Sequence, residues 1–399
     1  MKHVGAVYFE QVNNVIASDH KMISLDRGWA SIDGGPARRI NSLNELPSGV
    51  LWYTNLKNND FFLAQLHRHP NYRDESWLRT QFGQLCAELG LVTQQVPVYD
   101  SVPLISALAL RVIEAASDRY CIAPNSKRRL NEDFADQMAA PRSTVADQYY
   151  DKFREAAEHP TVTVLKSHNY TGYLPFVTVR RNRLRHAREV LATRVPPPDA
   201  GWELRRNSLP ERSDAWLEAI DTPFLAHCKV EGVDKKIADV ISWGSGAKNP
   251  REWLTDVEWR VVRQYGRVEV ASALVCKQPG IVLEQAERLP SDPFADLSLT
   301  LGLIAEQIWT ALTTKRPYRA TESRYATPAA WLRSTDRMLM FDYAQKLVSR
   351  GLPVHSYGVG NVVLRYPEGG LRNLIKIATE FGLLPPANMV AEARENQAV

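Results

Sequence analysis

The chain's C-terminal pattern reads LPVHSYG at residues 352–358 and NVVLRYP at residues 361–367. The glycines between these two runs favour a tight turn, so the pattern predicts a β-hairpin. One helix is expected to begin at Pro328 and end at Gly351, and a second helix is expected over residues 371–381. We therefore predict a helix–hairpin–helix unit over residues 327–399.

Residues 202–320 precede this unit, and their pattern predicts a helical domain. Asn249 is a favourable N-cap residue and Gly266 is suited to the position after a helix end. A proline in the first turn fits the same start, so a helix is expected from Pro250 to Tyr265.

A helix-turn-helix is expected directly after that helix. Small and apolar side chains recur at the spacing that such motifs use for their miniature core, namely Ala271, Leu274 and Ile281. In that arrangement Lys277 and Gln278 would open the recognition helix and contact base edges.

An arginine-rich helix ends the part of the chain over residues 151–195, after two expected strands at 161–166 and 174–180. Its basic residues are Arg180, Arg181, Arg183, Arg185 and Arg188. Arginines three or four residues apart share a helix face, so we expect this set to contact DNA phosphates. Three consecutive prolines at 196–198 cannot continue the helix and predict a linker.

Residues 1–124 predict a small N-terminal α+β domain. Strands are expected at 4–9, 21–25 and 50–53, and helices at 60–67, 75–89 and 104–116. The predicted fold class is therefore α+β: a mainly helical multi-domain protein with a small N-terminal α+β unit and a C-terminal helix–hairpin–helix.

Composition excludes several classes of protein. The net charge is +4 and the isoelectric point is about 8.8, with hydrophobic residues at 44%, as in an ordinary globular chain. No apolar run is long enough for a membrane span and no secretory signal is present, so we expect a cytoplasmic protein. The cysteines are far apart and are expected to be buried thiols: Cys86, Cys121, Cys228 and Cys276.

No recognised phosphate-binding loop or nucleophile motif is present in the sequence. We accordingly expect no catalytic residues, no metal site and no cofactor.

The order of features from Thr327 onward resembles the C-terminal part of phage terminase small subunits. In that family a Tyr-Ala-containing helix, here Tyr343-Ala344, precedes a glycine-rich strand-like segment. A further helix closes with Phe/Leu-Gly-Leu, here Phe381-Gly382-Leu383. The resemblance implies a ring-like oligomer that recognises the packaging start site on viral DNA, together with a separate large subunit that carries ATPase and nuclease activity.

We therefore favour a non-enzymatic DNA-binding protein of a phage or mobile element, with a role in genome packaging. The expected partners are duplex DNA, a large terminase subunit and other copies of the chain.

Two alternatives remain open. An RNA-binding or assembly subunit of a ribonucleoprotein would use the same basic surface, with base stacking on Tyr170, Tyr173 or Phe176. A nickase or nucleotidyltransferase would assemble a dispersed site from distant residues, namely His67, His69, Tyr149, Asp256 and Glu258.

Overall fold

The computed structural model divides the chain into two compact units. It describes residues 3–17, 20–41, 45–54, 72–74, 82–83, 85–86, 91, 96–123, 145–158, 163–165, 175–234, 240, 252–291, 293–296, 298–319, 322–366 and 369–390. Unit 1 comprises Met1–Gln137, Leu297–Gln307 and Ala387–Glu392. Unit 2 comprises Met138–Asp296, Ile308–Pro386 and Ala393–Val399.

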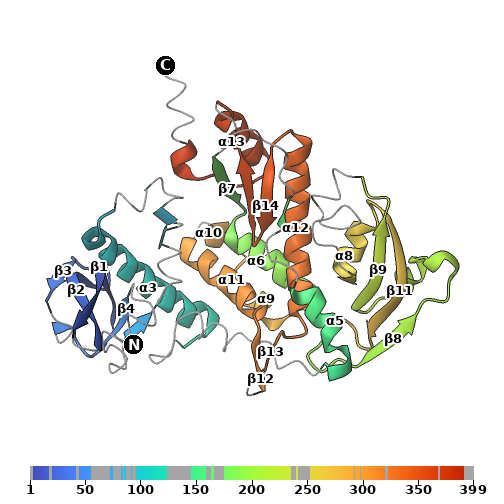
Figure 1. Cartoon of the computed structure of the whole chain (residues 1–399), viewed down its shortest axis with the longest axis horizontal. Helices are drawn as coiled ribbons and strands as arrows, with labels where there is room; N and C mark the ends of the chain where they lie inside the picture. The colour runs from blue at the N-terminus through green and yellow to red at the C-terminus, as the bar shows by residue number, and fades with distance from the viewer. Residues whose placement is uncertain are drawn as a thin grey trace. The chain divides into compact units, whose positions relative to one another are not determined.

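Unit 1 is built on a five-stranded sheet in the order β3-β2-β1-β4-β5 (Figure 1). The strands are β1 (His3–Ala17), β2 (His20–Ile32), β3 (Arg38–Ile40), β4 (Val50–Thr54) and β5 (Tyr72–Asp74). β1 pairs with β2 in antiparallel and with β4 in parallel, and helix α3 (Val98–Tyr120) packs against β1 and β2. The three strands expected in this region are confirmed.

Alternating side chains of β1 explain why both faces of this sheet are buried. Val7 packs in a cluster with Trp52, whereas Tyr8 packs in a second cluster with Val102 of α3. The helix expected over residues 104–116 lies within α3. The helix expected at 60–67 lies outside the described residues, and so does most of the one at 75–89.

Unit 2 contains an antiparallel sheet, here called the central sheet, in the order β6-β14-β15-β7. Its strands are β6 (Thr163–Val164), β7 (Phe176–Arg180), β14 (Val354–Gly358) and β15 (Asn361–Arg365). Helix α12 (Ala329–Ser349) packs against β14 and β15, and α13 (Leu371–Glu380) follows the hairpin. The predicted helix–hairpin–helix is confirmed.

Residues 151–195 and 327–399 were expected to be separate domains. β7 instead pairs with β15, and β6 pairs with β14, so the two parts share one sheet. Among the described residues, the short strands β6 and β7 of the first part pair with strands of the second.

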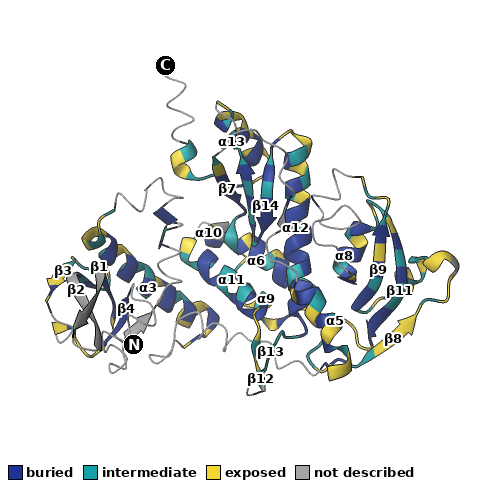
Figure 2. Ribbon diagram, viewed as in Figure 1, coloured by how far each residue is buried: buried dark blue, intermediate teal, exposed yellow. Residues whose placement is uncertain are grey.

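The expectation of a helical domain over 202–320 is wrong for its first half. Four strands form a second sheet in the order β10-β9-β11-β8: β8 (Trp202–Arg206), β9 (Phe224–Glu231), β10 (Trp253–Thr255) and β11 (Arg267–Cys276). Figure 2 shows β8 exposed along the sheet edge, whereas β9 and β11 are mostly buried.

The helix-turn-helix is also wrong, because Ala271 and Leu274 lie in β11. Val268 and Val270 alternate with polar neighbours and are β-branched, which favours a strand that pairs with β9. The helix expected from Pro250 is shorter: α8 covers Asp256–Val262, with Thr255 as its N-cap.

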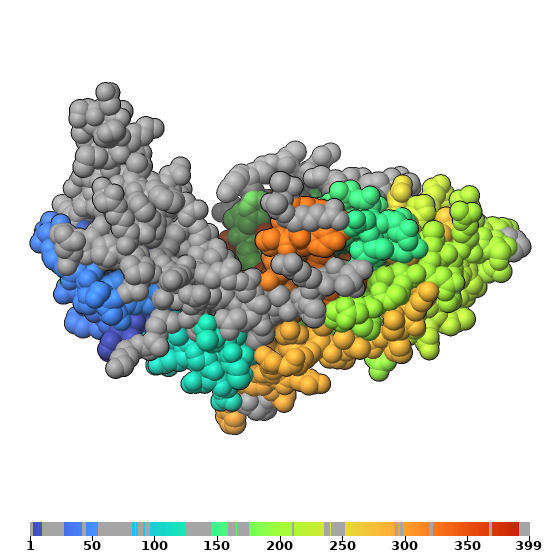
Figure 3. Space-filling view, turned by 90° about the horizontal axis from the view of Figure 1, so that it is seen from below, coloured from blue at the N-terminus to red at the C-terminus, as the bar shows by residue number. Residues whose placement is uncertain are grey.

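The remaining helices complete unit 2. They include α5 (Asp147–Glu158), α6 (Arg183–Leu191), α9 (Glu284–Glu287) and α10 (Pro293–Asp296), with the short 3-10 turns η4 (Pro210–Arg212) and η5 (Ala215–Ala219). Helix α11 (Leu299–Leu312) belongs to unit 1 up to Gln307 and to unit 2 from Ile308. A hairpin of β12 (Arg316–Arg319) and β13 (Glu322–Arg324) follows it. α5 packs against α12 and against β9 and β10 of the second sheet (Figures 1 and 3).

The fold class is α+β, as predicted, but more of the chain lies in β-sheets than the sequence indicated. Within the described part of the chain, every helix is too short or too polar to span a bilayer.

Candidate nucleic-acid interface

The predicted arginines lie where β7 passes into α6, and they do not form one exposed face. Arg180 and Arg181 are 9% and 6% exposed, whereas Arg185 is exposed at the surface. Asn182 caps α6, because its side-chain oxygen accepts a hydrogen bond of 3.0 Å from the Arg185 amide. Arg181 therefore precedes the helix, which begins at Arg183.

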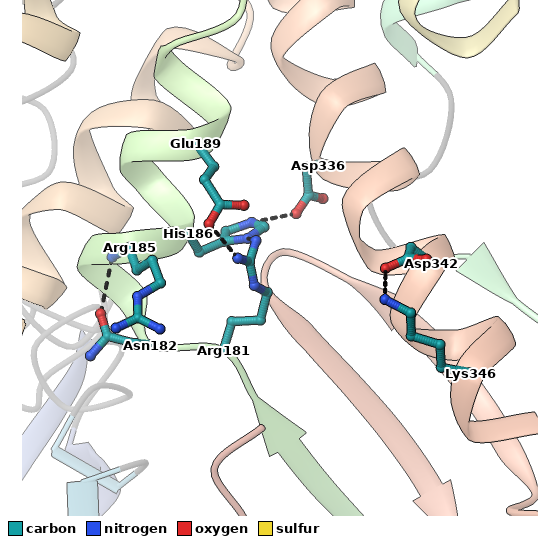
Figure 4. Close-up of polar contacts among 8 residues, drawn as sticks. All are labelled: Arg181, Asn182, Arg185, His186, Glu189, Asp336, Asp342 and Lys346. Atoms are coloured by element: carbon teal, nitrogen blue, oxygen red, sulfur yellow. Dashed lines mark hydrogen bonds and ion pairs between the residues drawn. The ribbon is translucent and has the colours of Figure 1, made fainter. Parts of the chain in front are cut away.

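Arg181 is held inside unit 2 by three contacts (Figure 4). Its Nη2 lies 2.6 Å from Glu189 Oε1, and its Nη1 donates to His186 Nδ1 at 3.1 Å. Its guanidinium carbon lies 5.1 Å from the centre of the Tyr343 ring. An arginine engaged in this way supports the structure rather than contacting a phosphate, so the prediction for Arg181 is corrected.

His186 links this arginine to a buried carboxylate on α12. Since an arginine can only donate, His186 Nδ1 must accept, which places the ring hydrogen on Nε2. Nε2 then donates to Asp336 Oδ1 at 2.8 Å. His186 and Asp336 are 2% and 1% exposed.

Asp336 also binds the turn between β14 and β15. The amides of Val359 and Gly360 donate to its two oxygens at 2.8 and 3.1 Å. Both residues have positive φ, at 52° and 68°, and consecutive amides in such a turn can converge on one anion. A side chain on residue 360 would begin 3.1 Å from the His186 ring, so the glycine allows the close approach. We call Arg181, His186, Glu189, Asp336 and this turn the turn network.

The other candidate residues serve local structure. Arg188 donates to the Pro290 carbonyl at 2.8 Å. Gln278 accepts from the Gly201 amide at 2.9 Å, and the Lys277 amide donates to the Gly201 carbonyl. Both residues follow the end of β11 rather than opening a helix, which corrects their predicted role as readers of bases.

The acidic residues of the dispersed site are also engaged. Asp256 Oδ1 accepts from Trp331 Nε1 at 2.6 Å, and burial raises the pKa of the Asp256 carboxyl. Glu258 pairs with the buried Arg337 at 3.0 Å. The two carboxylates therefore hold α8 against α12, each through a different partner.

Of the remaining residues named in the sequence analysis, the structure describes some and not others. Tyr149 lies in α5. Phe176 begins β7 and is 44% exposed. His67, His69, Tyr170 and Tyr173 lie outside the described residues. Of the cysteines, Cys86, Cys228 and Cys276 are buried as predicted, but Cys121 is exposed.

Comparison with known proteins finds a similar fold in one group of solved structures. No family model and no curated protein matches the chain. Among solved structures, Phi29 DNA polymerase complexed with primer-template DNA is similar, at 11% sequence identity and a TM-score of 0.52. The likeness covers 91% of this chain and 80% of that one. Phi29 DNA polymerase complexed with single-stranded DNA matches equally well, with a TM-score of 0.52.

This likeness overturns the prediction of a non-enzymatic packaging protein, since the similar solved structures are those of a DNA polymerase. The resemblance of the C-terminal residues to terminase small subunits is not tested by it and stays a prediction. The cytoplasmic location also stays a prediction.

Polymerase chemistry generally uses two metal ions held by carboxylates. In the turn network, Glu189 is paired with Arg181, and Asp336 is bound by His186 and two amides. These donors do not fit a divalent ion, since each carboxylate already has a cationic or N–H partner. Within the described residues, no group of three or more His, Cys, Asp and Glu side chains could hold a metal ion.

Proposed function

We propose that this protein binds DNA and takes part in nucleic-acid processing, with primed or single-stranded DNA as its partner. The observation that carries the proposal is the polymerase-like fold over 91% of the chain. The mildly basic charge of +4 is compatible with a polyanionic partner.

Arg185 is the residue of the predicted set best placed to contact a phosphate. It is exposed, and Figure 4 shows its side chain directed away from His186 and Asp336. The first turn of α6 carries no acidic residue that would repel a phosphate. Arg183 stands in the same turn and is half-buried.

The test is the salt dependence of DNA binding. Affinity for a primer–template and for a single strand is measured by fluorescence anisotropy over a series of salt concentrations. The logarithm of the affinity should fall linearly with that of the salt, because bound cations displace counterions from the DNA. Arg185→Gln should weaken binding on every sequence and lower the slope by about one.

Arg205→Gln is the matched control, since Arg205 is exposed on β8 and pairs with Glu203 on its own strand. Its salt slope should equal that of the wild type. If the wild-type protein binds neither form of DNA at the lowest salt, the proposed function is wrong.

A further inference from the structure

Phe176 presents an aromatic ring on the open face of the central sheet. The ring is 44% exposed, and Thr178 on the same side of β7 is exposed as well. The alternating residues Val177 and Val179 are buried, at 1% and 0% exposure. Since side chains of a strand alternate between faces, Phe176 lies on the face opposite the buried one.

Two side chains from the β14–β15 hairpin flank this ring. Arg365 of β15 is the direct cross-strand partner of Phe176, and its guanidinium carbon lies 5.0 Å from the ring centre. His355 lies on β14, which pairs with the far side of β15 and is two strands away from β7. The centres of the His355 and Phe176 rings are 4.9 Å apart, and their planes are tilted by 55°. The register of β14 shifts at this position, and such bulges re-aim a side chain.

The main chain beneath these side chains is fixed by hydrogen bonds. The His355 carbonyl accepts from the Leu165 amide at 2.9 Å, and the Arg365 amide donates to the Pro353 carbonyl at 2.9 Å. The ring and its two neighbours therefore belong to a rigid sheet rather than to a loop. A preorganised ring loses little conformational entropy when a ligand binds.

We propose that Phe176, Arg365 and His355 form a stacking platform for an unpaired nucleobase of a DNA strand. An exposed ring on an antiparallel sheet offers a flat apolar surface that any base can cover. The Arg365 guanidinium supplies the positive charge that complements the phosphate of the same nucleotide. The proposal rests on the proposed function, since it names the part of the DNA that unit 2 contacts.

The experiment compares Phe176→Ala with the wild-type protein on a single-stranded oligonucleotide at fixed salt. Removing the ring should weaken binding by about 5- to 150-fold, the range expected for the loss of one stacked base. Phe176→Trp should bind at least as well as the wild type. Phe294→Ala is the matched control, because Phe294 is 82% exposed on α10 and has no flanking ring or cation among the described residues.

Binding to an abasic DNA strand of the same length distinguishes base stacking from attraction to the phosphates. The wild type should bind this abasic strand as weakly as Phe176→Ala binds the normal one, and the substitution should cause no further loss on it. An equal loss on both strands would overturn the platform.

Photocrosslinking tests the platform without any substitution. DNA that carries 5-iodouracil should crosslink to Phe176 or His355 of the wild-type protein, as identified by mass spectrometry of the peptides. DNA that binds but never crosslinks to these residues would overturn the platform while leaving the proposed function intact. Failure of the wild type to bind any DNA would overturn the proposed function itself.

Discussion

The two ends of the central sheet use similar residues in opposite ways. At the turn end, Arg181, His186 and Asp336 bind one another and are at most 6% exposed. At the other end of the same strands, Arg365 and His355 flank a ring that is 44% exposed. Arginine and histidine side chains therefore do not indicate a nucleic-acid contact by themselves.

The two ends differ in whether the side chains at their centre must have hydrogen-bond partners inside the protein. A buried charged group must be paired, so the polar groups of the turn network are committed to one another. The ring of Phe176 is apolar and needs no hydrogen-bond partner, and 44% of the residue is exposed to a ligand. We infer that the turn end maintains the fold and that the open end contacts the partner.

The largest expected effect is the loss of Asp336. Asp336→Ala should lower the free energy of unfolding by about 3–5 kcal/mol, because it leaves a buried histidine and two amides without their shared acceptor. The measurement is urea denaturation followed by tryptophan fluorescence.

Asp342→Ala is the control for this change. Asp342 lies on the same helix, is 53% exposed and pairs with Lys346, as Figure 4 shows. Its replacement should cost less than about 1 kcal/mol. Equal losses for the two variants would show that the turn network does not hold the sheet.

A smaller loss of stability is expected for Arg181→Gln. The variant loses charge-assisted bonds to Glu189 and His186, which contribute about 1.5–3 kcal/mol, while Glu189 can still reach solvent. The salt slope of DNA binding should stay at the wild-type value, in contrast to that of Arg185→Gln. A fall in the slope of Arg181→Gln with no change in the free energy of unfolding would reverse the assignment of the two residues.

Sequence patterns predicted local elements because their causes are local. The β14–β15 hairpin follows from the glycines at 358 and 360, and most of α6 follows from its apolar spacing. Strand β11 was missed because Ala271 and Leu274 also suit a helix-turn-helix, and its partner β9 lies about forty residues earlier.

The spacing of the arginines in the sequence could not predict which of them are buried. Glu189 is a near neighbour of Arg181, but His186 and Asp336 are 150 residues apart in the chain. In the same way, the sequence offered Phe176 as a stacking residue only within the RNA-binding alternative, whereas Arg365 and His355 come from strands that only the folded sheet brings beside it. The residue types at both ends of the sheet were visible in the sequence. Which residues contact one another followed only from the sheet topology.

Asp256 offers a buried carboxylate to compare with Asp336, since it accepts a side-chain hydrogen bond from the neutral Trp331 and lies 3.7 Å from the exposed Arg260 guanidinium. Burial raises its pKa above the usual value of 3.8, so the folded state binds the proton more tightly than the unfolded state. Stability should therefore fall as the pH rises above 3.8 toward the folded pKa, by up to about 1.4 kcal/mol per pH unit. The measurement is urea denaturation over this window, and Asp256→Asn should remove that part of the slope. If the free energy of unfolding of the wild type changes with pH in parallel with that of the variant, the pKa of Asp256 is not raised in the folded state.

The smallest change in stability is expected for Arg365→Gln at the open end. An exposed cation–ring contact contributes about 0.5–1 kcal/mol, so the free energy of unfolding should change little. The affinity for single-stranded DNA should fall on every sequence, and the salt slope should decrease by about one, because one phosphate contact is lost. Lys346→Gln is the matched control, since Lys346 also lies over a ring, 5.6 Å from the centre of Tyr343, but near the turn network. If both variants lower the slope equally, the two ends of the sheet do not differ in function. If only Arg365→Gln does so, the open end meets the DNA backbone as well as a base, since the loss of a ring contact alone cannot change the number of counterions released.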